Sequence, residues 1–278
     1  MTFNSHAFTE KDRYLLDVQG VAVKKAFLSK EQVAQINADI DKSLASLSYS
    51  PYKFNFFELS YIFCEILESR FACDACEIFL GPQYRFDHCM GIQFPGKVKT
   101  KKGLLPMSGN LHGGNLMCQN SVFTLDYGTK SIFGQLGLGI ALSDQTPETG
   151  GFCYVLGSHR QPAYWQSGKH VFSKVLKGKF DQDVVTIPTL AAGDAFLFPD
   201  NLVHGTTGHK SNSKPRRSLY YKYVPGFAAW RPYEEIAHYK SLAKTKKQKE
   251  LLRPPYVAQL PGNIDYFDNS WKPPTNGN

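Results

Sequence analysis

Two histidines and one arginine in the second half of the chain have the types and spacing to carry chemistry. His112 lies in a Leu-His-Gly-Gly segment, His204 lies in Leu-Val-His-Gly-Thr, and Arg216 follows His204 by 12 residues. Imidazole is a good ligand for divalent iron. Two histidines from strands that are distant in the sequence can meet inside a barrel and leave several coordination positions of one ion free. A nearby guanidinium can then hold a carboxylate through two forked hydrogen bonds.

The segments around these three residues are short apolar runs of strand length. From Tyr84 onward such runs alternate with turns rich in Gly, Pro, Asn and Asp. Many short strands at this spacing are typical of a sandwich or barrel, so the sequence predicts a fold that is mainly β with flanking α-helices. The clearest runs are 133–142, 151–156, 184–187, 195–198 and 218–224.

Helical patterns flank this strand-rich part. Ser29 can cap a helix in which Gln32 stands three residues further on and apolar residues follow at helical spacing. Further helices are expected at about 57–80 and 232–252, and a strand-like piece at 20–27. We interpret the chain as a single domain. Its parts are a helical packing region at 1–83, the barrel core at 84–230, and a C-terminal helix with a covering tail at 231–278.

The composition is that of an ordinary globular protein. Hydrophobic residues make up 42% and charged residues 20% of the 278 residues, so the chain can bury a core without disulfide support. No window holds the roughly 18 uninterrupted apolar residues of a membrane span, and the first residues do not read as a signal peptide. The six cysteines are scattered, which favours reduced thiols in a cytoplasmic protein.

The net charge of +8 is distributed unevenly. Residues 201–253 hold 12 basic and three acidic residues, a local excess of +9. A solvated C-terminal helix is the simpler explanation of this excess. The alternative interpretation is attraction of an anionic small-molecule substrate. A nucleic acid partner is not indicated, because no recognition motif accompanies the charge.

The strand-rich part carries further short motifs in a fixed order. They are Arg85-Phe-Asp-His88, Leu111-His-Gly-Gly114, Ala141-Leu-Ser-Asp144, Pro147-Glu-Thr-Gly-Gly151, Gly157-Ser-His159, Gly193-Asp194, His204-Gly-Thr206 and Arg216-Arg-Ser-Leu219. None of them is specific alone, but their order and spacing together are. On these motifs the chain resembles the phytanoyl-CoA dioxygenase family of iron- and 2-oxoglutarate-dependent enzymes, over about residues 84–230.

The resemblance implies a double-stranded β-helix, a jelly-roll or cupin-like barrel, that binds Fe(II), 2-oxoglutarate and dioxygen and oxidises a small molecule. By this resemblance His112 and His204 would be the iron ligands. Arg216 would pair with the far carboxylate of 2-oxoglutarate, and the Thr206 hydroxyl would add a hydrogen bond. Arg217 should point to the opposite face because neighbours on a strand alternate, although a register shift of one residue would exchange the two arginines.

The sequence departs from the family at one catalytic position. The family has His-x-Asp at its first site, whereas Gly114 stands two residues after His112 here. In the first interpretation the protein resembles iron-dependent halogenases, and chloride or bromide takes the position that the carboxylate vacates. In the second it is a hydroxylase, and water or a side chain from elsewhere fills the gap. In the third it is a binding module that has lost catalysis. The candidate side chains for the gap are Asn115, Asp126 and Asp144.

Two further expectations concern the barrel walls and the remaining histidines. Aromatic residues of the strands should lie on or near the walls, namely Phe133, Phe196, Phe198, Tyr220 and Tyr223. His88, His170 and His209 are expected on the surface or in packing.

Overall fold

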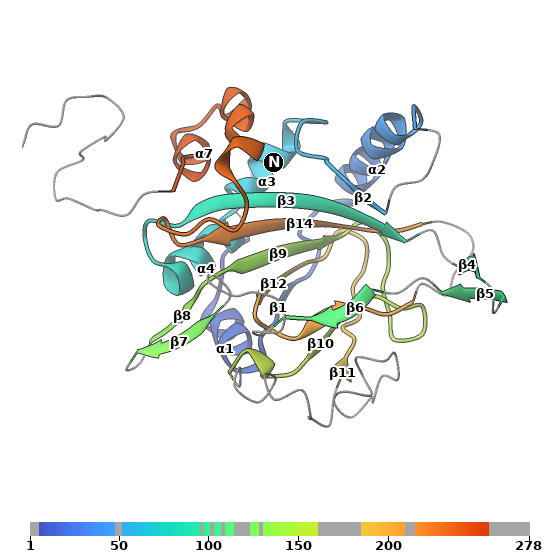
Figure 1. Cartoon of the computed structure of the whole chain (residues 1–278), viewed down its shortest axis with the longest axis horizontal. Helices are drawn as coiled ribbons and strands as arrows, with labels where there is room; N and C mark the ends of the chain where they lie inside the picture. Colours follow the sequence, from blue (N-terminus) through green and yellow to red (C-terminus); the bar gives the residue numbers. More distant parts are fainter. Residues whose placement is uncertain are drawn as a thin grey trace, which may run out of the picture.

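The computed structural model describes residues 6–47, 52–94, 97–100, 103–106, 109–113, 123–127, 130–160, 185–208 and 215–255. Within these ranges two antiparallel sheets lie one above the other (Figure 1). The larger has the strand order β1 (Ala22–Lys24), β12 (Ala195–Pro199), β9 (Leu136–Ala141), β14 (Arg216–Val224), β3 (Arg85–Phe94) and β2 (Lys53–Phe54). The smaller has the order β11 (Val185–Thr186), β10 (Phe152–Val155), β13 (His204–Thr206) and β6 (Gly109–His112).

Hairpins and helices complete the described part. The hairpins are β4 (Lys97–Thr100) with β5 (Gly103–Pro106), and β7 (Thr124–Tyr127) with β8 (Lys130–Phe133). The α-helices are α1 (Glu10–Gln19), α2 (Lys30–Leu44), α3 (Ile62–Leu67), α4 (Arg70–Leu80) and α7 (Lys246–Leu251). The short 3-10 helices are η3 (Ser158–Arg160), η4 (Tyr233–Glu235) and η5 (Ala237–Leu242).

The helices cover the outer face of the larger sheet. Figure 1 shows α2, α3 and α7 above β3 and β14, on the side away from β6 and β10. The main apolar core lies between these layers and joins buried residues of the helices to outward-facing residues of the strands. Two tyrosines of β14 tie the layers together, since the hydroxyl of Tyr221 donates to Phe63 O at 3.2 Å and that of Tyr223 to Leu67 O at 2.8 Å.

The inner face of the larger sheet points toward the smaller sheet. Side chains alternate along a strand, so the residues of β14 next to its outward-facing tyrosines face inward. Tyr220 is one of these inward-facing residues, and its ring lies edge-on to those of Phe196 and Phe198. Gly139 of β9 makes room for these rings, because a Cβ at this position would lie only 2.2 Å from the Phe196 ring. Phe152 of the smaller sheet completes the inner core, with its ring centroid 4.5 Å from that of Phe196.

Several sequence expectations hold and others need correction. Ser29 caps α2 as expected, through a reciprocal pair of hydrogen bonds with Gln32. The region 57–80 is two helices rather than one, because Ser69 is extended and starts α4. The C-terminal helix is shorter than expected and follows two 3-10 turns, while residues 256–278 of the expected covering tail lie outside the described ranges.

Two further corrections concern α1 and the aromatic residues of the walls. Helix α1 was not expected from the sequence; Thr9 caps its start through Asp12, and Gly20 is its C-cap. Phe133 and Tyr223 belong to the main apolar core that the helices share, not to the inner core around Phe196 and Phe198. None of the helices in the described ranges has both the length and the apolar character that crossing a membrane requires.

Candidate functional site

A cavity of about 270 Å³ lies between the two sheets. Inward-facing residues of β3, β12 and β14 form one wall, and residues of β6, β10 and β13 from the smaller sheet form the other. The candidate ligand and co-substrate residues His112, His204, Thr206 and Arg216 all line it, as do the expected wall residues Phe198 and Tyr220. Gly114 and Asn115 lie outside the described residues, as do His170 and His209.

The two histidines are directly opposite each other across neighbouring strands. His112 of β6 and His204 of β13 are register partners in the antiparallel pair, so their side chains leave the same face of the sheet. Their ring centroids are 4.4 Å apart. Two imidazoles at this separation, facing one cavity, can share one ion.

His204 is held in the form that binds a metal. Its Nδ1 lies 2.7 Å from the carbonyl oxygen of Leu202, and since a carbonyl only accepts, Nδ1 carries the proton and Nε2 keeps its lone pair. Burial and the neighbouring His112 lower the pKa of His204 to about 3, although the Asp200 carboxylate opposes the shift. The ring is therefore neutral over the physiological pH range, with Nε2 available to accept a metal ion.

The first glycine of the His-Gly-Gly motif has a backbone role. Gly113 has φ +113°, a region that side chains rarely adopt, and a Cβ there would lie 2.0 Å from the Leu202 carbonyl oxygen. This is the same carbonyl that orients His204. The close approach of the two segments brings His112 beside His204, so a glycine at position 113 is required by packing.

Replacing Gly113 with alanine is therefore expected to destabilise the protein. The left-handed conformation costs about 1–2 kcal/mol, and displacement of the Leu202 backbone adds about 1–3 kcal/mol. Urea unfolding followed by circular dichroism measures the change. Gly81→Ala is the matched control, because Gly81 has φ +88° but nothing within 4 Å of its Cβ position. Equal losses in the two variants would contradict the packing argument.

Arg216 carries a buried guanidinium that is only partly paired. It is 2% exposed. Its Nη2 donates to Thr206 Oγ1 at 2.6 Å and to Thr207 O at 2.9 Å, whereas Nη1 has no hydrogen-bond partner among the described residues. Burial lowers the pKa of Arg216 to about 10, which leaves the side chain charged at neutral pH. A buried cation with an unpaired donor suits the carboxylate of a ligand.

Thr206 and Arg217 have other partners in this structure. The Thr206 hydroxyl donates to Gly151 O at 3.0 Å while it accepts from Arg216, so it orients the guanidinium. Arg217 points to the helix side of the sheet, where Nη2 donates to Asp41 at 2.6 Å and Nε donates to Gln93 at 3.1 Å. The two neighbouring arginines therefore lie on opposite faces.

An ion pair between Asp200 and Lys222 also lines the cavity, and sequence reasoning missed it. Lys222 Nζ lies 4.4 Å from the centroid of the Phe198 ring. Burial alone would raise the pKa of Asp200, but Lys222, His204 and His112 together lower it to about 2. Lys222 could have been found from strand alternation, because it stands six residues after Arg216 on the same face.

His88 is buried, in agreement with an expected packing role, and it also lines the cavity, which the sequence did not indicate. A β-bulge in β3 leaves Asp87 without a partner in β14 and turns its carboxylate toward His88. His88 Nδ1 lies 2.6 Å from that carboxylate. Asp87 also accepts hydrogen bonds from the backbone of Trp230 at 2.9 Å and Arg231 at 3.2 Å. One buried carboxylate thus orients His88 and anchors the loop that closes this end of the cavity.

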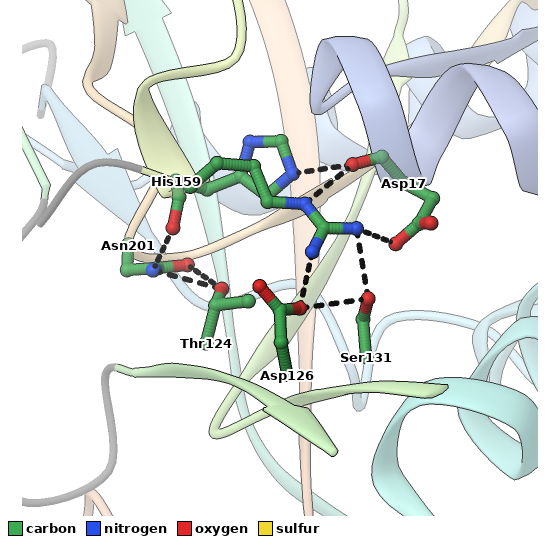
Figure 2. Close-up of polar contacts among 7 residues, drawn as sticks. Asp17, Thr124, Asp126, Ser131, His159 and Asn201 are labelled. Atoms are coloured by element: carbon green, nitrogen blue, oxygen red, sulfur yellow. Dashed lines mark hydrogen bonds and ion pairs between the residues drawn. The ribbon is translucent and has the colours of Figure 1, made fainter. Parts of the chain in front are cut away.

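The two candidate carboxylates for the vacant ligand position lie elsewhere. Figure 2 shows Asp126 and Ser131 of the β7–β8 hairpin, with Asp126 bound to the Arg160 guanidinium. Asp144 accepts a hydrogen bond from Ala192 N at 2.8 Å. Neither of these carboxylates lines the cavity.

Hydrogen bonds to neighbouring elements hold the segment that carries Asp200 and His204 in place. Asn201 donates to the carbonyl oxygen of His159 at 3.0 Å and to Thr124 Oγ1 at 2.9 Å (Figure 2). His159 is itself fully buried, with Nε2 2.9 Å from Asp17 O. Burial lowers the pKa of His159 to about 4, so it takes part in these contacts as a neutral ring.

The site fits an iron ion and a dicarboxylate in its donor set. No group of three or more His, Cys, Asp or Glu side chains within the described ranges is arranged to hold an ion, so two imidazoles are what this part of the chain offers. A site with two imidazoles leaves positions for a chelating co-substrate. The unpaired Nη1 of Arg216 lies in the same cavity for its far carboxylate.

Comparison with protein families gives a match to part of the chain. Residues 119–218 match the family model of phytanoyl-CoA dioxygenase (PhyH). The matched span includes His204 and Arg216, and His112 precedes it. A comparison with curated protein sequences finds no significant match.

Solved structures share the fold at low sequence identity. HygX from Streptomyces hygroscopicus with nickel and 2-oxoglutarate bound is 19% identical with a TM-score of 0.63, covering 81% of this chain and 90% of that chain. SnoN, a non-heme alpha-ketoglutarate-dependent epimerase from nogalamycin biosynthesis, is 19% identical with a TM-score of 0.56, covering 80% and 85%. EctD from S. alaskensis with 2-oxoglutarate and 5-hydroxyectoine is 16% identical with a TM-score of 0.56, covering 78% and 76%. These likenesses confirm the double-stranded β-helix, with separate rather than closed sheets in the described part.

Proposed function

We propose that the protein is a non-heme Fe(II)- and 2-oxoglutarate-dependent enzyme that oxidises an aliphatic C–H bond of a small molecule. One observation carries this proposal: three groups meet in a single cavity. The rings of His112 and His204 lie 4.4 Å apart, and the buried Arg216 guanidinium keeps Nη1 unpaired among the described residues. Imidazoles suit divalent iron, and a guanidinium suits the far end of a dicarboxylate.

Each of these residues would have a distinct role. His112 and His204 would hold the iron, which when bound supplies the activation of dioxygen. Arg216 would donate from Nη1 to the far carboxylate of 2-oxoglutarate. Thr206, already bonded to Nη2 at 2.6 Å, would keep the guanidinium in place for that contact.

The charge of the cavity favours an anionic substrate. Besides Arg216, the described lining carries Lys53, Lys222 and Arg231 against the single carboxylate of Asp200. Arg231 belongs to the basic stretch of the sequence, and its backbone is anchored on Asp87. Like charges that line a low-dielectric cleft focus the field and attract a substrate of opposite sign.

The type of oxidation depends on the occupant of the vacant position beside Gly114. A site that lacks the carboxylate there suits chloride or bromide, which would make the enzyme a halogenase. A hydroxylase is the second candidate, and the carboxylate of Asp200 in the same cavity favours it, because this charge reduces the need for a halide. A catalytically silent binding module is the third.

We also propose a cytoplasmic location. Cys64, Cys73, Cys76, Cys89 and Cys153 are free thiols. Free thiols are usual where the compartment is reducing.

Spectroscopy of the iron complex tests the proposal. Anaerobic addition of Fe(II) and 2-oxoglutarate is expected to give the weak visible charge-transfer band of the chelate. Absence of the band in folded protein would contradict the proposal and favour the silent module. A shift of the band when chloride is added supports a halide site, whereas an unmoved band at high chloride supports a hydroxylase.

Product analysis then decides the reaction. Anionic metabolites are incubated with the protein, Fe(II), 2-oxoglutarate, oxygen and bromide, and the mixture is examined by mass spectrometry. A product with the bromine isotope doublet identifies a halogenase. A product heavier by one oxygen atom in the presence of bromide identifies a hydroxylase.

A further inference from the structure

We propose that Asp200 balances the charge of the divalent ion at His112 and His204, in place of the carboxylate that Gly114 cannot supply. The inference rests on the proposed function, because it concerns the same ion. In this inference the carboxylate of Asp200 stabilises the ion electrostatically from nearby and does not coordinate it. No third acidic or histidine side chain completes a ligand group with the two imidazoles in the described part of the chain.

The position of Asp200 supports this assignment. It directly follows β12, and its backbone N–H donates to Gln135 O at 3.0 Å, which holds the residue at the cavity wall. The Phe198 ring lies 4.8 Å from the ring of His204. The same aromatic ring lies 4.4 Å from Lys222 Nζ, to which Asp200 is paired. The carboxylate and the imidazole are therefore held around one shared aromatic residue.

Asp200 and His204 are also fixed relative to each other. They stand at the two ends of a five-residue segment. Asn201 within it donates to His159 O at 3.0 Å, and Val203 N donates to Ser158 Oγ at 2.8 Å. These hydrogen bonds restrict the segment, so the carboxylate of Asp200 and the imidazole of His204 keep their relative position when a ligand binds.

The ion pair with Lys222 stabilises the largely buried carboxylate of Asp200. The side chain of Lys222 is 8% exposed and that of Asp200 is 19% exposed, so each needs a partner of opposite charge. An ion bound by the two imidazoles would place positive charge in the cavity that Asp200 also lines. Lys222 and the ion would then share one carboxylate, and the lysine would weaken the binding of the ion.

Metal affinity measures these two opposing effects without a substrate. Co²⁺ is titrated into the full-length, metal-free protein by calorimetry and visible absorbance, with circular dichroism as the check of folding. Asp200→Asn is expected to lower the Co²⁺ affinity by about 10- to 100-fold, the range for groups that support a metal from outside its ligands. Lys222→Met is expected to raise it by roughly 10-fold, because a cation is removed from the cavity.

The double variant separates a role toward the metal from a role toward the lysine. In the Lys222→Met background, Asp200→Asn is again expected to lower the Co²⁺ affinity by about 10-fold or more. This background also removes the unpaired lysine that could unfold the single Asp200→Asn variant. Equal affinities of Lys222→Met and the double variant would overturn the proposal, since Asp200 would then serve only to neutralise Lys222.

Controls distinguish this inference from the proposed function. Asp126→Asn and Asp144→Asn remove carboxylates outside the cavity and are expected to leave the affinity unchanged. Loss of Co²⁺ binding in His204→Ala, with no effect of Asp200→Asn in either background, would overturn the role of Asp200 alone. Unchanged binding in His204→Ala would overturn the iron site and the proposed function with it.

Discussion

His204→Ala is expected to lose Fe(II) binding and, with it, the consumption of 2-oxoglutarate. The ring is 7% exposed, faces the cavity and has its Nε2 lone pair free because Nδ1 is bonded to Leu202 O at 2.7 Å. Removing one of two imidazole ligands should cost more than the roughly 10- to 100-fold typical of groups outside the ligand set. Anaerobic Fe(II) titration and a succinate assay measure the two effects.

His112→Ala is expected to have the same effect, because its ring is the register partner of His204. His238→Ala is the matched control, since its side chain is 51% exposed and lies 3.5 Å from Glu58 on the surface. Retained Fe(II) affinity in folded His204→Ala protein would mean that the two imidazoles do not share an ion.

Arg216→Ala is expected to weaken 2-oxoglutarate binding strongly, and Arg217→Ala is expected to leave it nearly unchanged. The first change removes a buried cation whose Nη1 is unpaired among the described residues. Losing one member of a buried charged pair costs about 2–5 kcal/mol, or roughly 30-fold to more than 1,000-fold in affinity. Titration of the Fe(II) charge-transfer band with 2-oxoglutarate measures the difference.

The two controls for this pair test geometry and stability separately. Arg216→Lys should restore only part of the affinity, because an ammonium keeps the charge but not the fork. Arg217→Ala should instead lower the free energy of unfolding by about 1 kcal/mol, mainly through the hydrogen bond to Gln93, since its partner Asp41 is 66% exposed. A larger loss of 2-oxoglutarate affinity in Arg217→Ala than in Arg216→Ala would reverse the assignment of the two faces.

The architecture was predictable where short-range patterns decide it. The capping pair Ser29 and Gln32 indicated α2, and the apolar runs indicated β9, β10, β12 and β14. Alternation along a strand separated Arg216 from Arg217. The helices at the two ends were predicted less well, because their boundaries depend on how short segments pack on the sheet, as at Ser69 between α3 and α4.

The candidate site was predictable only in part. His112 and His204 could be proposed from their motifs, but their separation depends on the pairing of β6 with β13. His88 could not be placed in the cavity, because a bulge at Asp87 turns the two side chains toward each other. A bulge arises from the pairing of two strands and leaves no clear signal in one of them.

The sequence by itself determined the strand-rich architecture, the order of the candidate site residues and the placement of the two arginines on opposite faces, because each depends on the pattern within one segment; which arginine faces the cavity was decided by the register of β14. Only the tertiary structure decided that Asp200 and Lys222 pair inside the cavity, and that Asp126 and Asp144 lie outside it. The physical reason is that burial and ion pairing join residues far apart in the chain. A carboxylate acquires its role from the cation that folding places beside it.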